Sequence, residues 1–135
     1  MGDTYANQLD GLAELCAGDG EFMLLARHWT GKLRLSIGNN CVDLRMRDGV
    51  PVAEVAAVAA EQLPDEPGLI GLSATGDLWE RMLAPVPEPF YNDIVPAQAL
   101  GLQRSGSELT FWQYYPAVRR VVELLRSTPI GAGSA

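Results

Sequence analysis

The fold is decided by residues 31–58, which read GKLRLSIGNNCVDLRMRDGVPVAEVAAV. Apolar and polar residues alternate along 32–37 and again along 42–47. Successive side chains of a strand point to opposite faces, so the alternation predicts two strands with one apolar and one charged face each. The Gly, Asn and Asp residues at 38–40 and 48–49 tolerate the positive φ of tight turns. The pattern therefore indicates an antiparallel meander whose apolar face must be covered by helices or by a ligand.

The apolar face of these two strands is a candidate wall for an interior site. Its side chains are Leu33, Leu35 and Ile37 from the first strand, and Val42, Leu44 and Met46 from the second. We expect a third strand from about Val50, because the turn before it is so short. Pro51 is tolerated best at a strand start or at a sheet edge. The alanine-rich stretch 52–60 would also suit a helix, and its state stays open at this point.

Length and composition indicate a single globular domain. The chain has 135 residues, of which 47% are hydrophobic and 20% charged. We expect the domain to span 1–126 and the small, polar residues 127–135 to form a disordered tail. The formal net charge of −7 would repel a phosphate backbone, so nucleic acid is not an expected partner.

Helical signals flank the strands. Two apolar stripes with helical spacing precede them: Tyr5, Leu9, Leu12 and Cys16, then Phe22, Leu25, Ala26 and Trp29. Downstream we expect a strand at 69–73, a helix at 76–84 capped by Thr75, a short helical piece at 93–100 and a last strand at 101–105. Ser107 opens a C-terminal helical region, in which Pro116 must lie in a first turn or at a kink.

The residues that catalysis or metal binding would need are scarce. His28 is the single histidine, and Cys16 and Cys41 have no metal-ligand partners at suitable spacing. The glycines around Ser73 do not have the spacing of a nucleophile elbow. We therefore expect a protein that is not an enzyme and that needs no metal or other cofactor.

The sequence also predicts a location in the cytoplasm. It shows no secretion signal and no apolar run near the roughly 18 residues that span a bilayer. Its two cysteines are too few for a disulfide scaffold, so we expect reduced thiols.

The sequence also contains several large apolar side chains that have no role in catalysis or metal binding. Trp79, Met82 and Leu83 follow one predicted strand, and Trp112 and Tyr115 lie just before the C-terminal helix. Such side chains either fill a core or line a pocket for an apolar ligand.

The order of elements resembles the sterol carrier protein family, the type-two, non-specific lipid-transfer fold. The likeness rests on residues 29–38 (WTGKLRLSIG), the 48–49 turn, 69–74 (LIGLSA), 79–83 (WERML) and 100–107 (LGLQRSGS). It implies an α+β fold with a five-stranded, mainly antiparallel sheet covered on one face by helices. It also implies a tunnel between sheet and helices that accepts a fatty acyl chain, a sterol or a similar molecule, without catalysis. The chain lacks a peroxisomal Ser-Lys-Leu ending, so the resemblance implies a bacterial, cytoplasmic version.

On this resemblance, the six strand residues form one wall of the tunnel and Trp79, Met82 and Leu83 part of its roof. Trp112 and Tyr115 are expected near its mouth. The alternative is an interaction or dimerisation module, accessory to an enzyme, with no open pocket. The long apolar run 111–125 favours this alternative, since it offers more apolar surface than one small sheet can cover. The expected partners are thus an apolar small molecule or lipid, and a homodimer or a partner enzyme in the second case.

Overall fold

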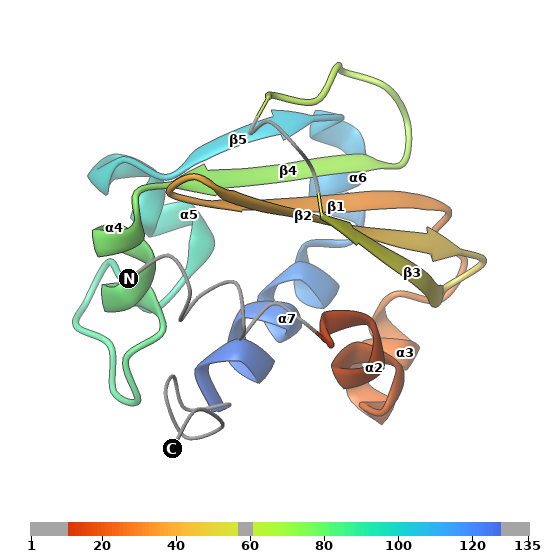
Figure 1. Cartoon of the computed structure of the whole chain (residues 1–135), viewed down its shortest axis with the longest axis horizontal. Helices are drawn as coiled ribbons and strands as arrows, with labels where there is room; N and C mark the ends of the chain where they lie inside the picture. The colour runs from red at the N-terminus through yellow and green to blue at the C-terminus, as the bar shows by residue number, and fades with distance from the viewer. Residues whose placement is uncertain (1–10, 57–60, 128–135) are drawn as a thin grey trace.

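A five-stranded sheet with helices on one face forms the protein, as the computed structural model of residues 11–56 and 61–127 shows (Figure 1). The strands are β1 Gly31–Ile37, β2 Asn40–Arg47, β3 Val50–Ala56, β4 Leu69–Ala74 and β5 Gln103–Gly106. Their order in the sheet is β3-β2-β1-β4-β5. Neighbouring strands are antiparallel except for the parallel pair of β1 and β4. The predicted α+β class with a mainly antiparallel sheet is confirmed.

The strand register places the apolar positions on one face. Leu33 lies opposite Leu44, and Leu35 lies between Val42 of β2 and Leu72 of β4. The meander predicted from the alternating pattern is therefore confirmed. The third strand starts at Val50 as predicted and ends at Ala56, and the rest of the ambiguous stretch lies outside the described residues.

The helices lie on the apolar side of the sheet (Figure 1). They are α2 Leu12–Ala17, α3 Gly20–Leu25, α4 Gly76–Met82, α5 Ile94–Ala97, the 3₁₀ helix η1 Gln98–Leu100, α6 Glu108–Gln113 and α7 Tyr115–Ser127. Thr75 and Ser107 cap α4 and α6 by accepting hydrogen bonds from Leu78 and Thr110, as the sequence predicts. Pro116 is the second residue of α7, where its missing N–H costs nothing.

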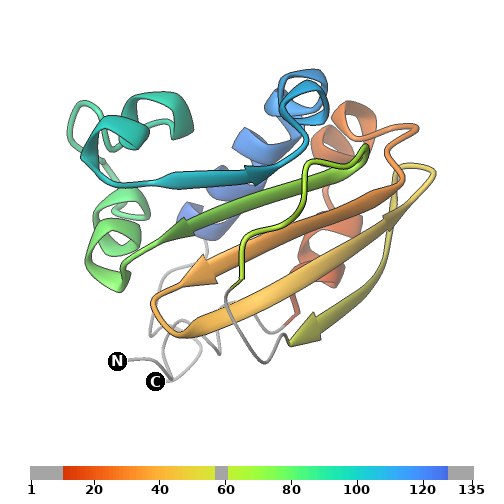
Figure 2. The ribbon, with the colours of Figure 1, turned by 90° about the horizontal axis from the view of Figure 1, so that it is seen from above.

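The opposite face of the sheet is crossed by the chain that leads into β4 (Figure 2). Arg34 of β1 donates to the carbonyl of Glu61, and the N–H of Gly106 donates to the carbonyl of Leu63. Arg34 also forms a two-point ion pair with Asp43 of β2, with N–O distances of 2.7 and 2.9 Å. Burial opposes ionisation of Asp43, but Arg34 and then Lys32 outweigh it and lower the pKa of Asp43.

One predicted helix ends earlier than its apolar stripe indicates. The helix α3 stops at Leu25, and His28 adopts a positive φ of 73°. The chain reverses here beside Gly49 of the β2–β3 turn, which lies against the backbone of Arg27 and His28 and donates its N–H to the carbonyl of Trp29 at 2.8 Å. Trp29 therefore lies outside the helix, although it is fully buried.

Two other helices end at residues that differ from the predicted ones. The helix α4 stops at Met82, two residues before the predicted end. The helix α7 includes Ser127, one residue beyond the predicted domain boundary, and the remainder of the predicted tail lies outside the described residues. The first helix is described from Leu12, so Tyr5 and Leu9 also fall outside.

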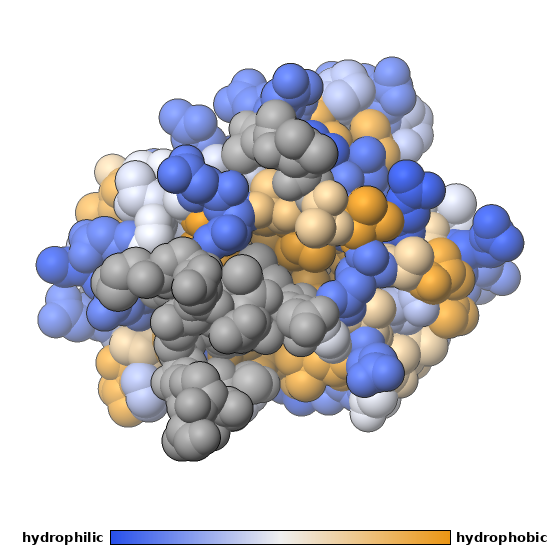
Figure 3. All heavy atoms as spheres, in the orientation of Figure 1, coloured by the Kyte–Doolittle hydropathy of each residue, from blue (hydrophilic) through white to orange (hydrophobic). Residues whose placement is uncertain are grey.

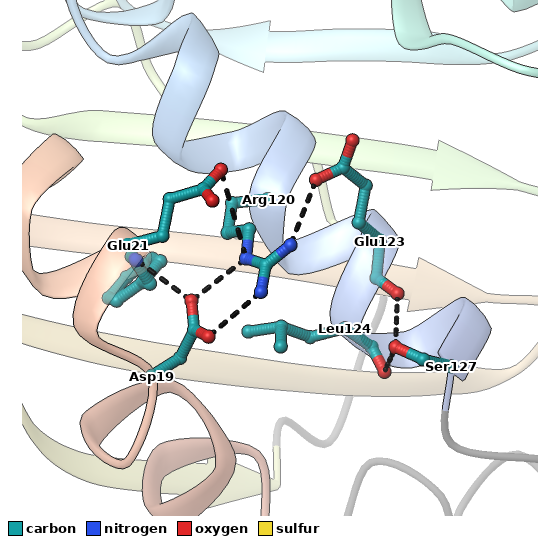
Figure 4. Close-up of polar contacts among 7 residues, drawn as sticks. Asp19, Glu21, Arg120, Glu123, Leu124 and Ser127 are labelled. Carbon is teal, nitrogen blue, oxygen red and sulfur yellow. Dashed lines mark hydrogen bonds and ion pairs between the residues drawn. The ribbon is translucent and has the colours of Figure 1, made fainter.

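A two-point ion pair joins the first and last parts of the helical layer (Figure 4). Arg120 of α7 lies 2.8 and 2.9 Å from the two carboxylate oxygens of Asp19. Asp19 also accepts a hydrogen bond from the N–H of Phe22 and so caps α3. The same carboxylate thus sets the start of α3 and its position against α7.

Candidate functional site

The predicted wall of the site is buried beneath the helices. Leu33, Leu35 and Leu44 have no exposed surface, and Ile37, Val42 and Met46 are at most 7% exposed. Side chains of a strand alternate between faces, and the register of β1 and β2 brings these six to the same face. The structure therefore brings the six predicted wall residues together.

The predicted roof is the helix α4 and the residue that follows it. Trp79 and Met82 are fully buried, and Leu83 is 6% exposed. The indole N–H of Trp79 donates to the carbonyl of Ser36 in β1 at 2.9 Å. At the other end of the helix, Arg126 of α7 donates two 3.0 Å hydrogen bonds to the carbonyl of Met82. These contacts hold α4 to both the sheet and α7.

The two residues predicted at the mouth lie where α6 joins α7. Trp112 is 49% exposed, and its N–H donates to a carboxylate oxygen of Glu108 at 2.8 Å. Its ring meets that of Tyr115 edge-on at 5.5 Å. The Tyr115 hydroxyl donates to Asp93, and burial together with this bond raises the pKa of Tyr115 to about 12. Figures 1 and 2 show α4 and α6 at opposite ends of the helical layer, so this pair is not next to the roof residues.

The interior is closely packed around the central wall and roof residues. A side chain with no accessible surface touches no void that could hold a water molecule. This holds for Leu33, Leu35, Leu44, Trp79 and Met82. A ligand among these five side chains would have to displace some of them.

Among the cavities lined by described residues are three that lie outside this apolar interior. The largest of these three, of about 340 Å³, runs along β5 and has mostly polar walls. The others, of about 10 Å³ each, lie beneath the 61–62 crossing and between α5 and α7.

Sequence reasoning missed the polar cluster in the cavity along β5. Arg104 of β5 donates from Nε to Gln98 and from Nη2 to Glu108, at 3.1 and 2.9 Å. Its guanidinium carbon also lies 4.0 Å from the ring centre of Phe111. The one signal in the sequence was the i, i+4 spacing of Arg104 and Glu108, which is typical of an ion pair along a helix. Here Arg104 belongs to β5 and Glu108 to α6, so a helical pattern does not reveal the pair.

The thiol of Cys16 offers no nucleophile. Burial, with Asp19 and Glu54 nearby, raises its pKa to about 12, so the thiol stays protonated at neutral pH. Residues 11–56 and 61–127 contain no group of three or more His, Cys, Asp or Glu side chains that could hold a metal ion. None of the helices described is long and apolar enough to cross a membrane.

No protein-family model matches the sequence, and no curated protein matches it either. Two solved structures match its fold. The crystal structure of sterol carrier protein 2 has a TM-score of 0.70 and 16% identity, over 91% of this chain and 96% of that one. The fold is sterol-carrier-like.

The second structure supports the same assignment of the fold. It is the solution structure of a conserved hypothetical protein from Thermus thermophilus, suggested to be a sterol carrier protein. Its TM-score is 0.68 at 17% identity, over 96% of this chain and 91% of that one. The resemblance to sterol carrier proteins noted in the sequence is thereby confirmed for the fold.

Proposed function

We propose that this protein binds and carries an apolar ligand, such as a fatty acyl chain or a sterol, between its sheet and its helices. The observation that carries the proposal is the sterol-carrier-like fold, shared over 91% of the chain with sterol carrier protein 2. The uninterrupted apolar face of β1 and β2 supports it, because an apolar ligand needs such a wall. The proposal includes a cytoplasmic location and assigns no catalytic residue.

Ligand entry requires the helical layer to move away from the sheet. The wall and roof are in close contact in the structure, so an acyl chain would replace contacts between side chains. In the view of Figure 3, apolar atoms reach the surface near the centre of the molecule, among hydrophilic ones. Each buried methylene contributes about 0.8 kcal/mol. About ten of them would supply the roughly 8 kcal/mol of micromolar binding, before the cost of opening.

A second candidate is the interaction or dimerisation module without an open pocket. The close packing of Leu35 and Trp79 favours it, since no space for a ligand exists around either side chain. Leu109 and Trp112 of α6 are 78% and 49% exposed and would be available to a partner. Light scattering separates the two candidates, because a dimer independent of concentration that takes up no lipid would favour the module.

The experiment compares lipid binding by the natural chain with binding by two matched variants. Purified protein is extracted with organic solvent for mass spectrometry, and a fluorescent fatty acid is titrated into delipidated protein. Val42→Phe enlarges a side chain on the helix side of the sheet, in the space that the ligand would use. Val55→Phe adds the same atoms on the neighbouring strand, where Val55 is 42% exposed and lies on the opposite face.

We expect micromolar binding that Val42→Phe weakens at least tenfold and Val55→Phe leaves unchanged. Overpacking costs about 1–3 kcal/mol, so folding of Val42→Phe is checked by circular dichroism. If folded natural protein yields no lipid and takes up no fatty acid at micromolar concentrations, the carrier proposal is wrong. If both variants bind like the natural chain, the ligand lies elsewhere.

A further inference from the structure

The strand β5 forms one edge of the sheet (Figure 2), and the cavity of about 340 Å³ lies along it. The other walls of this cavity are the crossing segment before β4, the helix η1 and the start of α6. All four residues of β5 line it, although their side chains alternate between the two faces of the sheet. The cavity therefore runs beside the outer edge of β5, where a further strand would be added.

The pairing of β5 with β4 fixes which main-chain groups point toward this edge. Gly106 lies opposite Ile70, and the N–H of Ser107 donates to the carbonyl of Leu69 at 2.7 Å. In an antiparallel pair, a bond at this position means that Gly106 and Ile70 exchange no hydrogen bonds with each other. Such pairs alternate with bonded ones, and Arg104 is two residues from Gly106 in the same register. Arg104 therefore also directs its N–H and C=O away from β4.

The main chain of Arg104 is left open on this edge. Before it, the N–H of Leu102 donates to the carbonyl of Ala97 at 3.2 Å. After it, the N–H of Gly106 donates to the carbonyl of Leu63 at 3.1 Å. Within residues 11–56 and 61–127, neither the N–H nor the C=O of Arg104 has a hydrogen-bond partner outside the sheet. The edge thus presents a donor and an acceptor with the spacing that a neighbouring strand satisfies.

The side chains around this open pair are polar, and their charges are balanced. The guanidinium of Arg104 pairs with Glu108 at 2.9 Å and lies over the rings of Phe111 and Trp112, at 4.0 and 5.4 Å from their centres. The cation of the cavity is therefore already paired within the protein. The neutral polar residues of the wall are Gln62, Gln98, Gln103, Ser105 and Ser107. Amides and hydroxyls suit a neutral ligand that both donates and accepts hydrogen bonds.

We propose that this edge binds a short, extended, neutral polar segment of another protein, which adds to β5 as a sixth strand. One residue of the segment would accept from the N–H of Arg104 and donate to its C=O. At the spacings of strands and stacked sheets one strand residue fills roughly 160 Å³, so the cavity has room for about two residues.

The chemistry of the occupant follows from the surroundings of the edge. The net charge of −7 disfavours an acidic segment. The β5 strand of a second copy is flanked by η1 and α6, so it does not enter as a bare extended segment. The inference goes beyond the proposed function, because strand addition needs no acyl chain in the interior.

Nuclear magnetic resonance measures the open N–H directly. The probe is a capped pentapeptide of alternating threonine and glutamine, which is neutral, polar and favours an extended chain. We expect the amide signal of Arg104 to shift with a saturable Kd on the order of 1 mM. Its hydrogen exchange should slow about tenfold or more at saturation. The amide of Ser105 is the internal control and should change little, because the same alternation directs it toward β4.

N-methylated peptides test whether main-chain pairing supplies the affinity. Methylation of every second amide blocks one edge of an extended peptide and leaves the other edge able to pair. This peptide should bind within about threefold of the unmodified one. Methylation of all amides should abolish saturable binding up to about 10 mM, because the side chains remain but no N–H can donate to Arg104.

Two substitutions at one position separate the main chain of Arg104 from its side chain. Arg104→Ala removes the guanidinium and keeps the N–H, so it should bind the peptide within about threefold of the natural chain. Arg104→Pro also removes the N–H, which proline can lack on an edge strand without loss of a bond to β4. It should weaken binding about tenfold or more. Circular dichroism checks that both variants fold, and the methylated peptides test the same point in the natural chain.

Several results would overturn the inference. They are the absence of a saturable shift of the Arg104 amide up to about 10 mM peptide, natural affinity in folded Arg104→Pro, and equal binding of the fully methylated peptide. A dimer in light scattering whose Arg104 amide is protected without peptide would assign the edge to a second copy instead. Fatty acid uptake is measured on the same natural protein. Peptide binding without uptake would support this inference and count against the carrier proposal alone.

Discussion

The indole N–H of Trp79 in α4 donates a 2.9 Å hydrogen bond to the main-chain carbonyl of Ser36 in β1. The two residues are 43 positions apart, and both are buried. The bond fixes the helix that we place over the proposed ligand site against the sheet beneath it. It also satisfies the one polar atom that a fully buried tryptophan brings into a core.

Trp79→Phe should therefore destabilise the protein. The change removes the donor and leaves a void beside Ser36, and we expect a loss of about 1–3 kcal/mol in the free energy of unfolding. Urea denaturation followed by circular dichroism measures it. Trp112→Phe is the matched control, because Trp112 is half exposed, and it should stay within about 0.5 kcal/mol. Equal effects of the two changes would show that the Trp79 bond contributes nothing of its own.

Leu35→Ala should mainly lower the stability of the fold, whereas Trp112→Ala should mainly lower the affinity for a fatty acid. Leu35 is fully buried in the centre of the sheet, and its truncation opens a cavity that costs about 2–5 kcal/mol. Trp112→Ala should destabilise the fold less but weaken uptake of a fluorescent fatty acid about tenfold, or roughly 1.4 kcal/mol. If Trp112→Ala unfolds the protein or leaves fatty acid affinity untouched, our placement of Trp112 at the ligand entrance is wrong.

Gly106→Ala should be far more damaging than Gly11→Ala. The two glycines share nearly the same positive φ, 88° and 89°. A Cβ at Gly106 would lie 2.3 Å from the carbonyl oxygen of Leu69, whereas a Cβ at Gly11 would meet no atom of the described residues within 4 Å. We expect a cost of about 1 kcal/mol at Gly11 from the φ alone. At Gly106 the new Cβ would also push the main chain of Leu69 in β4 away, which adds to that cost. Thermal melts of the two variants measure the difference in stability.

The ion pair between Asp19 and Arg120 should make stability depend on pH in acid. The hydrogen bond from Arg120, then that from the N–H of Phe22, lowers the pKa of Asp19 from 3.8 to about 2. A carboxylate whose pKa is lower in the folded state stabilises the fold fully above its unfolded pKa. This contribution should be lost as the pH falls from about 4 to about 2.

Urea denaturation across this range compares the natural chain with Asp19→Asn. The stability gap between them should be constant above about pH 5 and shrink as the pH approaches 2. Asp77→Asn is the control, because Asp77 is 82% exposed and lies 3.8 Å from Arg81. A gap for Asp19→Asn that does not change with pH would show that the pair does not persist in solution.

Local signals in the sequence predicted most of the secondary structure. The alternation on either side of the 38–40 turn gave β1 and β2, and Thr75 and Ser107 marked the starts of α4 and α6. These signals are reliable here because a turn or a cap depends on neighbours within a few residues. The apolar stripe that ends at Trp29 predicted too long a helix, because the chain reverses at His28, where it lies against Gly49 from a distant part of the sequence.

The sequence by itself determined the class of the fold and which side chains face its interior. Alternation assigns Leu33, Leu35 and Leu44 to one face of a sheet wherever the helices lie. Only the tertiary structure decided how closely that face is covered. It also decided that Gln98, Arg104 and Glu108, from three different elements, would meet in one polar cavity. Such meetings depend on how whole elements pack, and no periodicity along the chain records them.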